Sequence, residues 1–343
     1  MKKLIFSIIL AFSTFPAFAA NILNIYIWGN YLPAEVVREF TKETGIRLNI
    51  SEYDNNETMF AKLKASAHSG YDIIVPSSYF VERMRKQNML EQIDKTQLSN
   101  FKNLNPALLN KEFDPNNNYS IPYLWGTTGI IVNTDYFEKD SIKSWNEFWE
   151  QKFADKLMIL DDVREVFAMA FLTLGYPIND ANPQHIEQAY QKLKTLMPNI
   201  KIFNIDAIPN IFIDEDATVG MAWNGDCRLT QEENPKVKYI YPKEGFTIWI
   251  DNLAIVKNAP NLANAYKFID FILRPDIAKK IIQNTGSSSP NLAGIKLLPK
   301  EMQQNPVINP DAETLKRGKI LSDLDSKTLQ LYEKYWEKLK MGE

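Results

Sequence analysis

The sequence predicts an α/β fold in which a mostly parallel sheet is covered by helices on both faces. Three observations carry this prediction. Short runs rich in β-branched and aromatic residues alternate with helix-like segments along the chain. Several of these runs are apolar throughout, as in strands buried on both faces. The length of 343 residues corresponds to about two domains of ordinary size, each with its own core.

The first part of the chain alternates strictly between predicted strands and helices. Pro33 lies near the start of the first helix and Gly45 at its end, as expected for helix boundaries. Gly70 ends a second helix, and Pro76 stops an apolar strand. The predicted elements are strands at 22–28, 46–53 and 71–75, and helices after Pro33, at 56–69 and at 83–88.

Five more apolar runs predict the strands of the remaining chain, at 129–132, 157–160, 218–223, 236–241 and 247–256. The run at 247–256 is longer than a typical strand. In a two-domain α/β protein such a run can cross from one domain to the other. The alternation of these strands with helical stretches again favours parallel pairing.

The first 19 residues have the features of a secretory signal peptide. Lys2 and Lys3 supply the positive start, an apolar stretch follows at 4–12, and Ala17-Phe18-Ala19 matches a cleavage signal. The apolar stretch is too short to span a bilayer. We therefore expect an exported chain that begins at Ala20, whose net charge changes from -3 to -5 when Lys2 and Lys3 are removed.

Composition and motifs exclude several function classes. Lys and Arg number 39 against 42 Asp and Glu, so no basic excess is available for nucleic-acid binding. The dinucleotide, P-loop, serine-hydrolase and zincin motifs are absent. Cys227 is more typical of a small buried residue than of a nucleophile, and His68 and His185 lack metal-ligand spacing. The sequence therefore predicts no catalytic residue, no metal and no cofactor.

Aromatic and acidic residues gather at the ends of the predicted strands, where ligands bind in open α/β sheets. Asp162 and Glu165 lie three apart, on one side of a helical turn if Asp162 opens a helix. Trp249 and Asp251 share one face of their strand. The candidate ligand-binding residues are Trp28, Tyr31, Ser77, Tyr79, Asp162, Glu165, Trp223, Asp226, Trp249 and Asp251.

Each candidate also has a purely structural interpretation. A strand-terminal Trp often only packs, Asp162 and Glu165 are compatible with a capping box, and Asp226 is compatible with a turn. Asp251 is harder to explain, because a carboxylate within an apolar strand needs a cation or several donors. Taken together, aromatic faces and carboxylates suit an alkylammonium ligand: rings cover the methylenes, and carboxylates accept its N–H donors.

The chain resembles the bacterial spermidine/putrescine-binding proteins of ABC importers over essentially the whole mature sequence. The resemblance rests on short blocks spread along the chain: Asn56-Glu57-Thr58-Met59, Ala61-Lys62-Leu63-Lys64, Tyr71-Asp72 to Val75-Pro76-Ser77, Phe113-Asp114-Pro115-Asn116-Asn117, Tyr119-Ser120-Ile121-Pro122-Tyr123, Arg164-Glu165-Val166-Phe167, Trp223-Asn224-Gly225, Tyr241-Pro242-Lys243-Glu244-Gly245 and Pro310-Asp311-Ala312-Glu313-Thr314.

The resemblance implies a two-lobed periplasmic binding protein of the type II-like class, with a mostly parallel sheet in each lobe and a ligand cleft between them. It implies a monomer that captures putrescine or spermidine in the periplasm and delivers it to a membrane permease. We expect the first lobe at 20–128 plus 251–296 and the second at 129–250 plus 297–343. The family's polyamine contacts match every candidate above except Asp226.

Two positions depart from the spermidine-type members that the chain resembles. Those members have an acidic residue where this chain has Asn30 and a Gln where it has Leu321. Asp226, in Trp-x-Gly-Asp, looks like the acid of the putrescine-type members. Because an unpaired buried ammonium is costly, the number of carboxylates should set the ligand preference. We expect putrescine to bind at least as well as spermidine.

The sequence is also compatible with three alternative functions. A sugar-binding protein uses similar aromatic platforms, but it needs neutral amides more than acids. A hydrolase with Asp162 and Glu165, or Asp226 and Asp251, as acid and base is a second alternative. In the third, the loaded protein docks on a sensor and acts as a polyamine-sensing regulator, with the same residues in the cleft.

Overall fold

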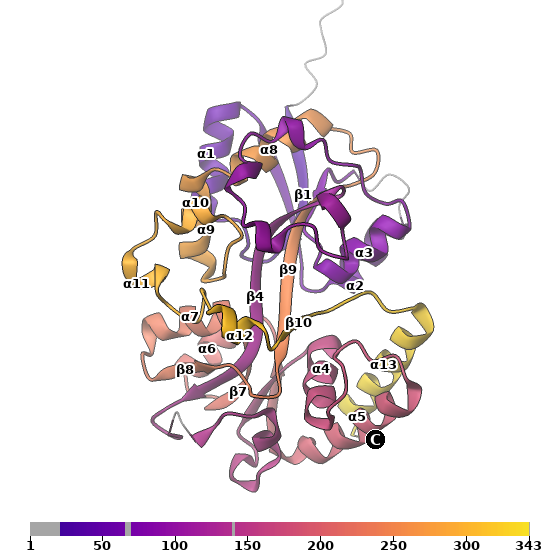
Figure 1. Ribbon diagram of the computed structural model, residues 1–343, viewed down its shortest axis with the longest axis vertical. Helices are drawn as coiled ribbons and strands as arrows, with labels where there is room; N and C mark the ends of the chain where they lie inside the picture. Colours follow the sequence, from indigo (N-terminus) through magenta and orange to yellow (C-terminus); the bar gives the residue numbers. More distant parts are fainter. Residues whose placement is uncertain (1–20, 66–69, 139–140, 343) are drawn as a thin grey trace, which may run out of the picture.

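The computed structural model describes residues 21–65, 70–138 and 141–342. The predicted signal peptide and His68 lie outside these described residues. The described strands form one ten-stranded sheet in the order β2-β1-β3-β9-β4-β7-β5-β6, with β10 beside β9 and β8 beside β4. Helices flank this sheet on both sides, which confirms the predicted α/β class (Figure 1).

The bounds of the elements are as follows. The strands are β1 (Ile22–Trp28), β2 (Arg47–Tyr53), β3 (Ile73–Ile74), β4 (Ser120–Asn133), β5 (Leu157–Leu160), β6 (Ile200–Asn204), β7 (Val219–Trp223), β8 (Val237–Ile240), β9 (Phe246–Ile255) and β10 (Gly318–Ile320). The α-helices are α1 (Ala34–Thr44), α2 (Asn56–Ala65), α3 (Ser78–Lys86), α4 (Val163–Leu174), α5 (Pro183–Leu196), α6 (Ile208–Ile213), α7 (Asn224–Glu233), α8 (Leu262–Ile272), α9 (Pro275–Thr285), α10 (Leu292–Ile295), α11 (Lys300–Gln303), α12 (Ala312–Leu315) and α13 (Ser326–Lys340). The 3-10 helices are η1 (Lys95–Gln97), η2 (Phe101–Asn103), η3 (Pro106–Leu108), η4 (Pro115–Asn117), η6 (Trp145–Trp149), η7 (Gln151–Phe153) and η8 (Met197–Asn199).

The sheet belongs to two lobes that β4 and β9 connect. In the first lobe β1 pairs in parallel with β2 and β3, and in the second lobe β5 pairs in parallel with β6 and β7. β4 and β9 pair with each other in antiparallel register and extend from one lobe into the other (Figure 1). The predicted crossing run at 247–256 corresponds to β9.

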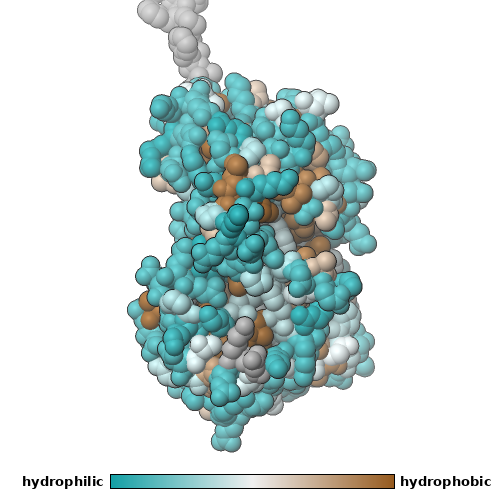
Figure 2. Space-filling model, turned by 60° about the vertical axis from the view of Figure 1, so that its left-hand side comes forward, coloured by the Kyte–Doolittle hydropathy of each residue, from teal (hydrophilic) through white to brown (hydrophobic). Residues whose placement is uncertain are grey.

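Each lobe has its own apolar core. In the first lobe Phe40 of α1 packs edge-on against Phe268 of α8, with ring centroids 5.3 Å apart. In the second lobe Phe167 of α4 packs on Tyr332 of α13, with centroids 4.9 Å apart. A third apolar cluster joins side chains of both lobes, among them Phe80 of α3 and Ala168 of α4, and the space-filling view shows the molecule narrowing between the lobes (Figure 2).

Several predicted boundaries agree with the structure. The strands at 22–28 and 157–160 are β1 and β5 with unchanged bounds. Pro33 is the N-cap of α1, and Gly45 ends it in the left-handed conformation with φ 70°, where glycine is favoured. The helix opened by Asp162 is α4. Local capping chemistry therefore positions the segments that carry the candidate site residues.

Two strand predictions were wrong in length. The strand predicted at 71–75 is reduced to β3, although the backbone of Asp72 still bonds to Asn24 and Val256 on either side. The strand predicted at 129–132 is the end of β4, which begins nine residues earlier at Ser120. Pro122 argues against a strand at this start, because proline is rare inside strands. The structure accommodates Pro122 next to an irregularity in the pairing of β4 with β9.

Candidate functional site

A buried carboxylate lies where β9 meets the first lobe. Asp251, 3% exposed, accepts hydrogen bonds from the Ser77 hydroxyl at 2.6 Å and from the Tyr31 hydroxyl at 2.8 Å. Ser77 is the N-cap residue of α3, and Tyr31 lies in the turn after β1. Burial raises the pKa of Asp251 to about 6, against the opposing effect of the two hydrogen bonds. The fold therefore brings three of the predicted residues into direct contact.

Asn56 joins this group to Tyr79. Its Nδ2 donates to Ser77 Oγ at 3.0 Å and to Tyr79 Oη at 3.1 Å, and its Oδ1 accepts from the Ser77 backbone N–H at 3.1 Å. Asn56 is 3% exposed. This role of Asn56 is not predictable from the sequence, because its partners are more than 20 positions away and no local pattern marks them.

An aromatic wall lies beside Asp251. Trp28 donates its indole N–H to the Val75 carbonyl at 2.8 Å, and Tyr53 donates its hydroxyl to the same carbonyl at 2.6 Å. The Trp28 ring centroid is 4.7 Å from that of Tyr53 and 6.2 Å from that of Tyr31. Because their polar ends are engaged by protein groups, Trp28 and Tyr53 offer apolar ring surface to a ligand.

The second lobe contributes two carboxylates from the start of α4. Asp162 is the N-cap and accepts from the backbone N–H groups of Arg164 at 2.9 Å and Glu165 at 3.0 Å, so its structural interpretation is correct. The capping-box interpretation of Glu165 is wrong, because its carboxylate turns to the Thr247 hydroxyl on β9. Burial and the charge of Asp162 raise the pKa of Glu165 to about 8, and burial also raises the pKa of Asp162.

Trp223, Asp226 and Trp249 complete the group of predicted residues. Trp223 ends β7, and Asp226 lies in the first turn of α7, where burial raises its pKa to about 7. Burial and Asp251 raise the pKa of Tyr31, and the charge of Asp226 contributes a smaller part of this effect. Trp249 lies on β9, paired with Gly126 of β4 at the junction of the lobes.

The carboxylates of the candidate site form no salt bridge in the part of the chain that the structure describes. The four are Asp162, Glu165, Asp226 and Asp251. Arg164 lowers the pKa of Asp162 and Glu165 through its charge, but its Nη2 donates to Asn179 and to the Ser322 carbonyl. Glu165 and Asp251 are buried, and Asp162 and Asp226 are half-buried. Acids without an ion-pair partner, next to aromatic faces, form a site that favours a cationic and partly apolar ligand.

The predicted residues fall into two groups. The first lobe brings together Trp28, Tyr31, Ser77 and Tyr79 with Asp251 of β9, and the second lobe supplies Asp162, Glu165, Trp223 and Asp226. The Arg164 guanidinium carbon lies 5.3 Å from the Tyr79 ring centroid and so connects the groups. Sequence reasoning missed Asn56, Tyr53 and Thr247, which orient these residues from distant segments.

Gly126 makes room for Trp249. A Cβ at position 126 would lie 2.2 Å from the Trp249 ring and 2.1 Å from Asn224 Oδ1, and Asn224 is held by Thr127 and Val307. We therefore expect Gly126→Ala to displace the indole and to lower the free energy of unfolding by about 1–3 kcal/mol, measured by urea denaturation.

The matched control for this substitution is Gly29→Ala. Gly29 has no atom within 4 Å of the added Cβ, so its alanine variant should unfold like the wild type. If all three proteins unfold with the same free energy, β4 and β9 move enough at position 126 to accommodate the added methyl group. Close packing then does not fix Trp249.

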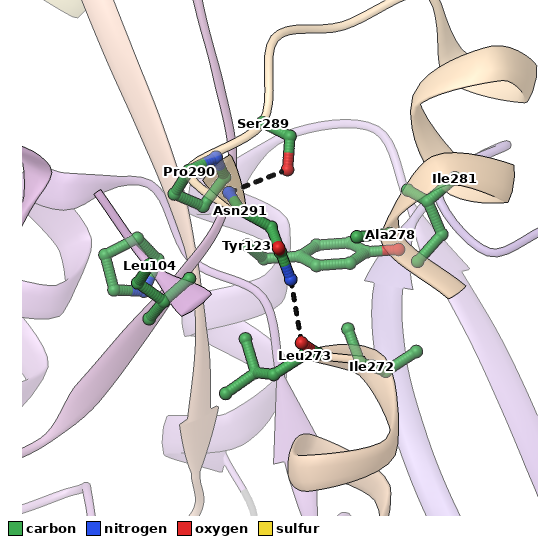
Figure 3. A pocket seen from close by; sticks show the side chains of 10 residues that line it. Leu104, Tyr123, Ile272, Leu273, Ala278, Ile281, Ser289, Pro290 and Asn291 are labelled. Atoms are coloured by element: carbon green, nitrogen blue, oxygen red, sulfur yellow. Dashed lines mark hydrogen bonds between the residues drawn. The ribbon is translucent and has the colours of Figure 1, made fainter. Parts of the chain in front are cut away.

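Other features of the described residues add no second site. The pocket in Figure 3 lies in the first lobe around Tyr123, and none of the residues that line it is charged. Cys227 is buried, as predicted, and His185 stacks on Tyr176 and contacts Asp180. Within residues 21–65, 70–138 and 141–342, no three His, Cys, Asp or Glu side chains are placed to hold a metal ion together. No helix in these ranges has both the length and the apolar composition that a membrane span requires.

Comparison with known proteins identifies the family. Residues 35–310 match the model of the bacterial extracellular solute-binding proteins. The chain is 45% identical to the spermidine/putrescine-binding periplasmic protein of Escherichia coli over 322 residues, covering 94% of this chain and 92% of that protein. It is 32% identical to the putrescine-binding periplasmic protein PotF of the same organism over 339 residues, covering 93% and 91%.

Solved structures agree with this assignment. A spermidine/putrescine ABC transporter chain from Listeria monocytogenes superposes with a TM-score of 0.90 at 34% identity, covering 94% of this chain and 100% of that one. The substrate-binding protein PotD from Streptococcus pneumoniae gives a TM-score of 0.81 at 34% identity, with 94% and 99% covered. This chain therefore belongs to the bacterial extracellular solute-binding proteins, in the group that contains the periplasmic spermidine/putrescine-binding proteins.

Proposed function

We propose that this protein captures a polyamine between its two lobes and delivers it to the permease of an ABC importer. The observation that carries the proposal is the set of four carboxylates without an ion-pair partner in the described residues, placed around aromatic side chains at the junction of the lobes. The names of the similar proteins support it, since they are spermidine/putrescine-binding periplasmic proteins.

Each group has a role that follows from its chemistry. Asp251 binds one ammonium while Tyr31 and Ser77 keep its carboxylate oriented, and Asp162 with Glu165 binds another from the second lobe. Trp28, Tyr79, Trp223 and Trp249 cover the methylenes between them. A ligand that contacts both lobes at once shifts the equilibrium toward the closed form, and the closed form presents the surface that the permease recognises.

The cellular setting follows from the same proposal. The predicted signal peptide at 1–19 directs the chain to the periplasm. There the mature protein acts as a monomer and catalyses no reaction. We propose that the lobes divide inside the crossing strands, with 20–128 plus 251–296 in the first and 129–250 plus 297–343 in the second. Within 297–343, Met302 packs with Ile282 of α9 and Asp323 pairs with Arg83 of α3, so this segment also contacts the first lobe.

We further propose that putrescine binds at least as well as spermidine. Asn30 lies in the turn between Trp28 and Tyr31 with φ 62°, so this turn carries an uncharged side chain where the spermidine-type members that the chain resembles have an acid. Leu321 is 5% exposed in the same cluster of apolar side chains as Tyr79, so it offers no acceptor to a third nitrogen. A third ammonium that finds no carboxylate at these two positions is costly to bury.

Calorimetric titration tests the function directly. Putrescine and spermidine should both bind, whereas 1,4-butanediol, which has the length of putrescine but no charge, should not bind measurably. A sugar panel serves as the second control. Binding of a sugar in place of the amines would contradict the proposal, and a spermidine affinity a hundredfold tighter than that of putrescine, about 2.8 kcal/mol, would refute the stated preference.

A further inference from the structure

Residues 320–323, which the proposed division places in the second lobe, form hydrogen bonds with residues of both lobes. This segment, called the strap below, begins at the end of β10, whose residues pair with the start of β9. From there the chain passes between α3 above and α4 below before it reaches α13 (Figure 1). The strap therefore has one helix of each lobe on either side.

On the first-lobe side the strap is fixed to α3. Arg83 donates to Asp323 Oδ1 through Nε at 2.9 Å and Nη2 at 2.7 Å, and the two side chains are 15% and 13% exposed. The Asp323 backbone N–H donates to Glu82 at 3.1 Å. Both Arg83 donors share the single oxygen Oδ1, and an ion pair with this little exposure is screened less by water than an ordinary surface pair.

On the second-lobe side the strap is fixed to α4 and to Asn179. Arg164 Nη2 donates to the Ser322 carbonyl at 3.2 Å and to Asn179 Oδ1 at 3.1 Å. Asn179 Oδ1 also accepts from the Ser322 N–H at 3.0 Å, and its Nδ2 donates to the Ile320 carbonyl at 3.0 Å. Arg164 is 1% exposed, so these contacts are shielded from water.

The two helices that the strap joins both begin with residues of the binding site. Ser77 and Tyr79 lie at the start of α3, and Asp162 and Glu165 lie at the start of α4. Building on the proposed function, we infer that the strap sets the distance between these two groups, and that Asp323 and Asn179 are positioning residues for polyamine binding although neither belongs to the binding site. A ligand that bridges two groups dissociates slowly only where the groups are held ready for it.

The test combines one substitution at each anchor. Asp323→Asn removes the charge that pairs with Arg83, and Asn179→Ala removes the three contacts that Asn179 makes with the strap and Arg164. Stopped-flow tryptophan fluorescence with putrescine and with spermidine should show dissociation rates raised about tenfold in each variant and association rates nearly unchanged. The double variant should dissociate no faster than the worse single one, since loss of either anchor frees the strap.

Asp276→Asn is the matched control. It breaks an ion pair with Arg274 that lies within the first lobe alone, so it should leave both rates unchanged. Asp323→Glu keeps the negative charge and should restore most of the slow dissociation. Dissociation rates equal to wild type in both anchor variants, or effects that multiply in the double variant, would overturn the inference. A wild-type protein that binds neither amine would instead refute the proposed function, and the inference with it.

Discussion

Asp251→Asn is expected to weaken binding of putrescine and spermidine by more than about a hundredfold, or about 3 kcal/mol. The substitution keeps the shape of the side chain but removes the charge that we propose faces the ammonium, and it replaces one of the two oxygens that accept from Ser77 and Tyr31 by a donor. Loss of a buried charge partner leaves the ligand cation desolvated without compensation. Titration calorimetry on the purified variant measures the change.

Asp114→Asn is the control for this prediction. Asp114 is also buried in the first lobe, but its carboxylate accepts from Ser120 and Tyr119 rather than facing the site. Its variant should lose stability and keep wild-type affinity. If Asp251→Asn binds both amines as tightly as the wild type, the ammonium does not lie at Asp251.

Polyamine affinity is expected to fall steeply as the pH is lowered from 8.5 to 5.5. The pKa values are about 8 for Glu165, about 7 for Asp226 and about 6 for Asp251, all raised chiefly by burial. A bound ammonium favours the ionised carboxylate and lowers each pKa, so binding releases protons. Below its pKa, each carboxylate that must ionise weakens binding by roughly tenfold per pH unit. The ligand amines stay protonated over this range, since a lysine amine has a pKa of about 10.4.

The raised pKa values also determine how the stability of the ligand-free protein changes with pH. Because the folded pKa of these carboxyls is raised, the ligand-free protein loses stability as the pH rises from the unfolded pKa toward the folded one. The thermal shift produced by a saturating amine should therefore grow between pH 5.5 and 8.5. Calorimetry in buffers of different ionisation enthalpy counts the released protons, and a count of zero at pH 7 would contradict an ammonium bound at Glu165.

Short-range chemistry explains which parts of the fold could be predicted. Pro33 and Gly45 bound α1 because one fixes φ and the other tolerates the left-handed conformation, and both requirements are local. β4 was mostly missed because Pro122 and Gly126 break its strand pattern. Strand β4 accommodates Pro122 because its pairing with β9 is irregular there, and it needs Gly126 because the Trp249 ring lies against that position. Both β9 and Trp249 come from a distant part of the chain.

For the candidate site, too, local features could be predicted and long-range contacts could not. Asp251 could be singled out from the sequence, since a carboxylate in an apolar strand demands partners. Which partners it has could not be predicted, because Ser77 and Tyr31 are more than 170 positions away. Glu165 illustrates the opposite error: its spacing from Asp162 fits a capping box, yet Thr247 on β9 offers a hydroxyl that only the folded chain brings near.

A crystal structure of the protein grown with putrescine tests the central claim most directly. The diamine should lie between the lobes, with one nitrogen at the Asp251 carboxylate and its methylenes against the rings of Trp223 and Trp249. Electron density for the amine at any place away from Trp223, Trp249 and Asp251 would contradict the account.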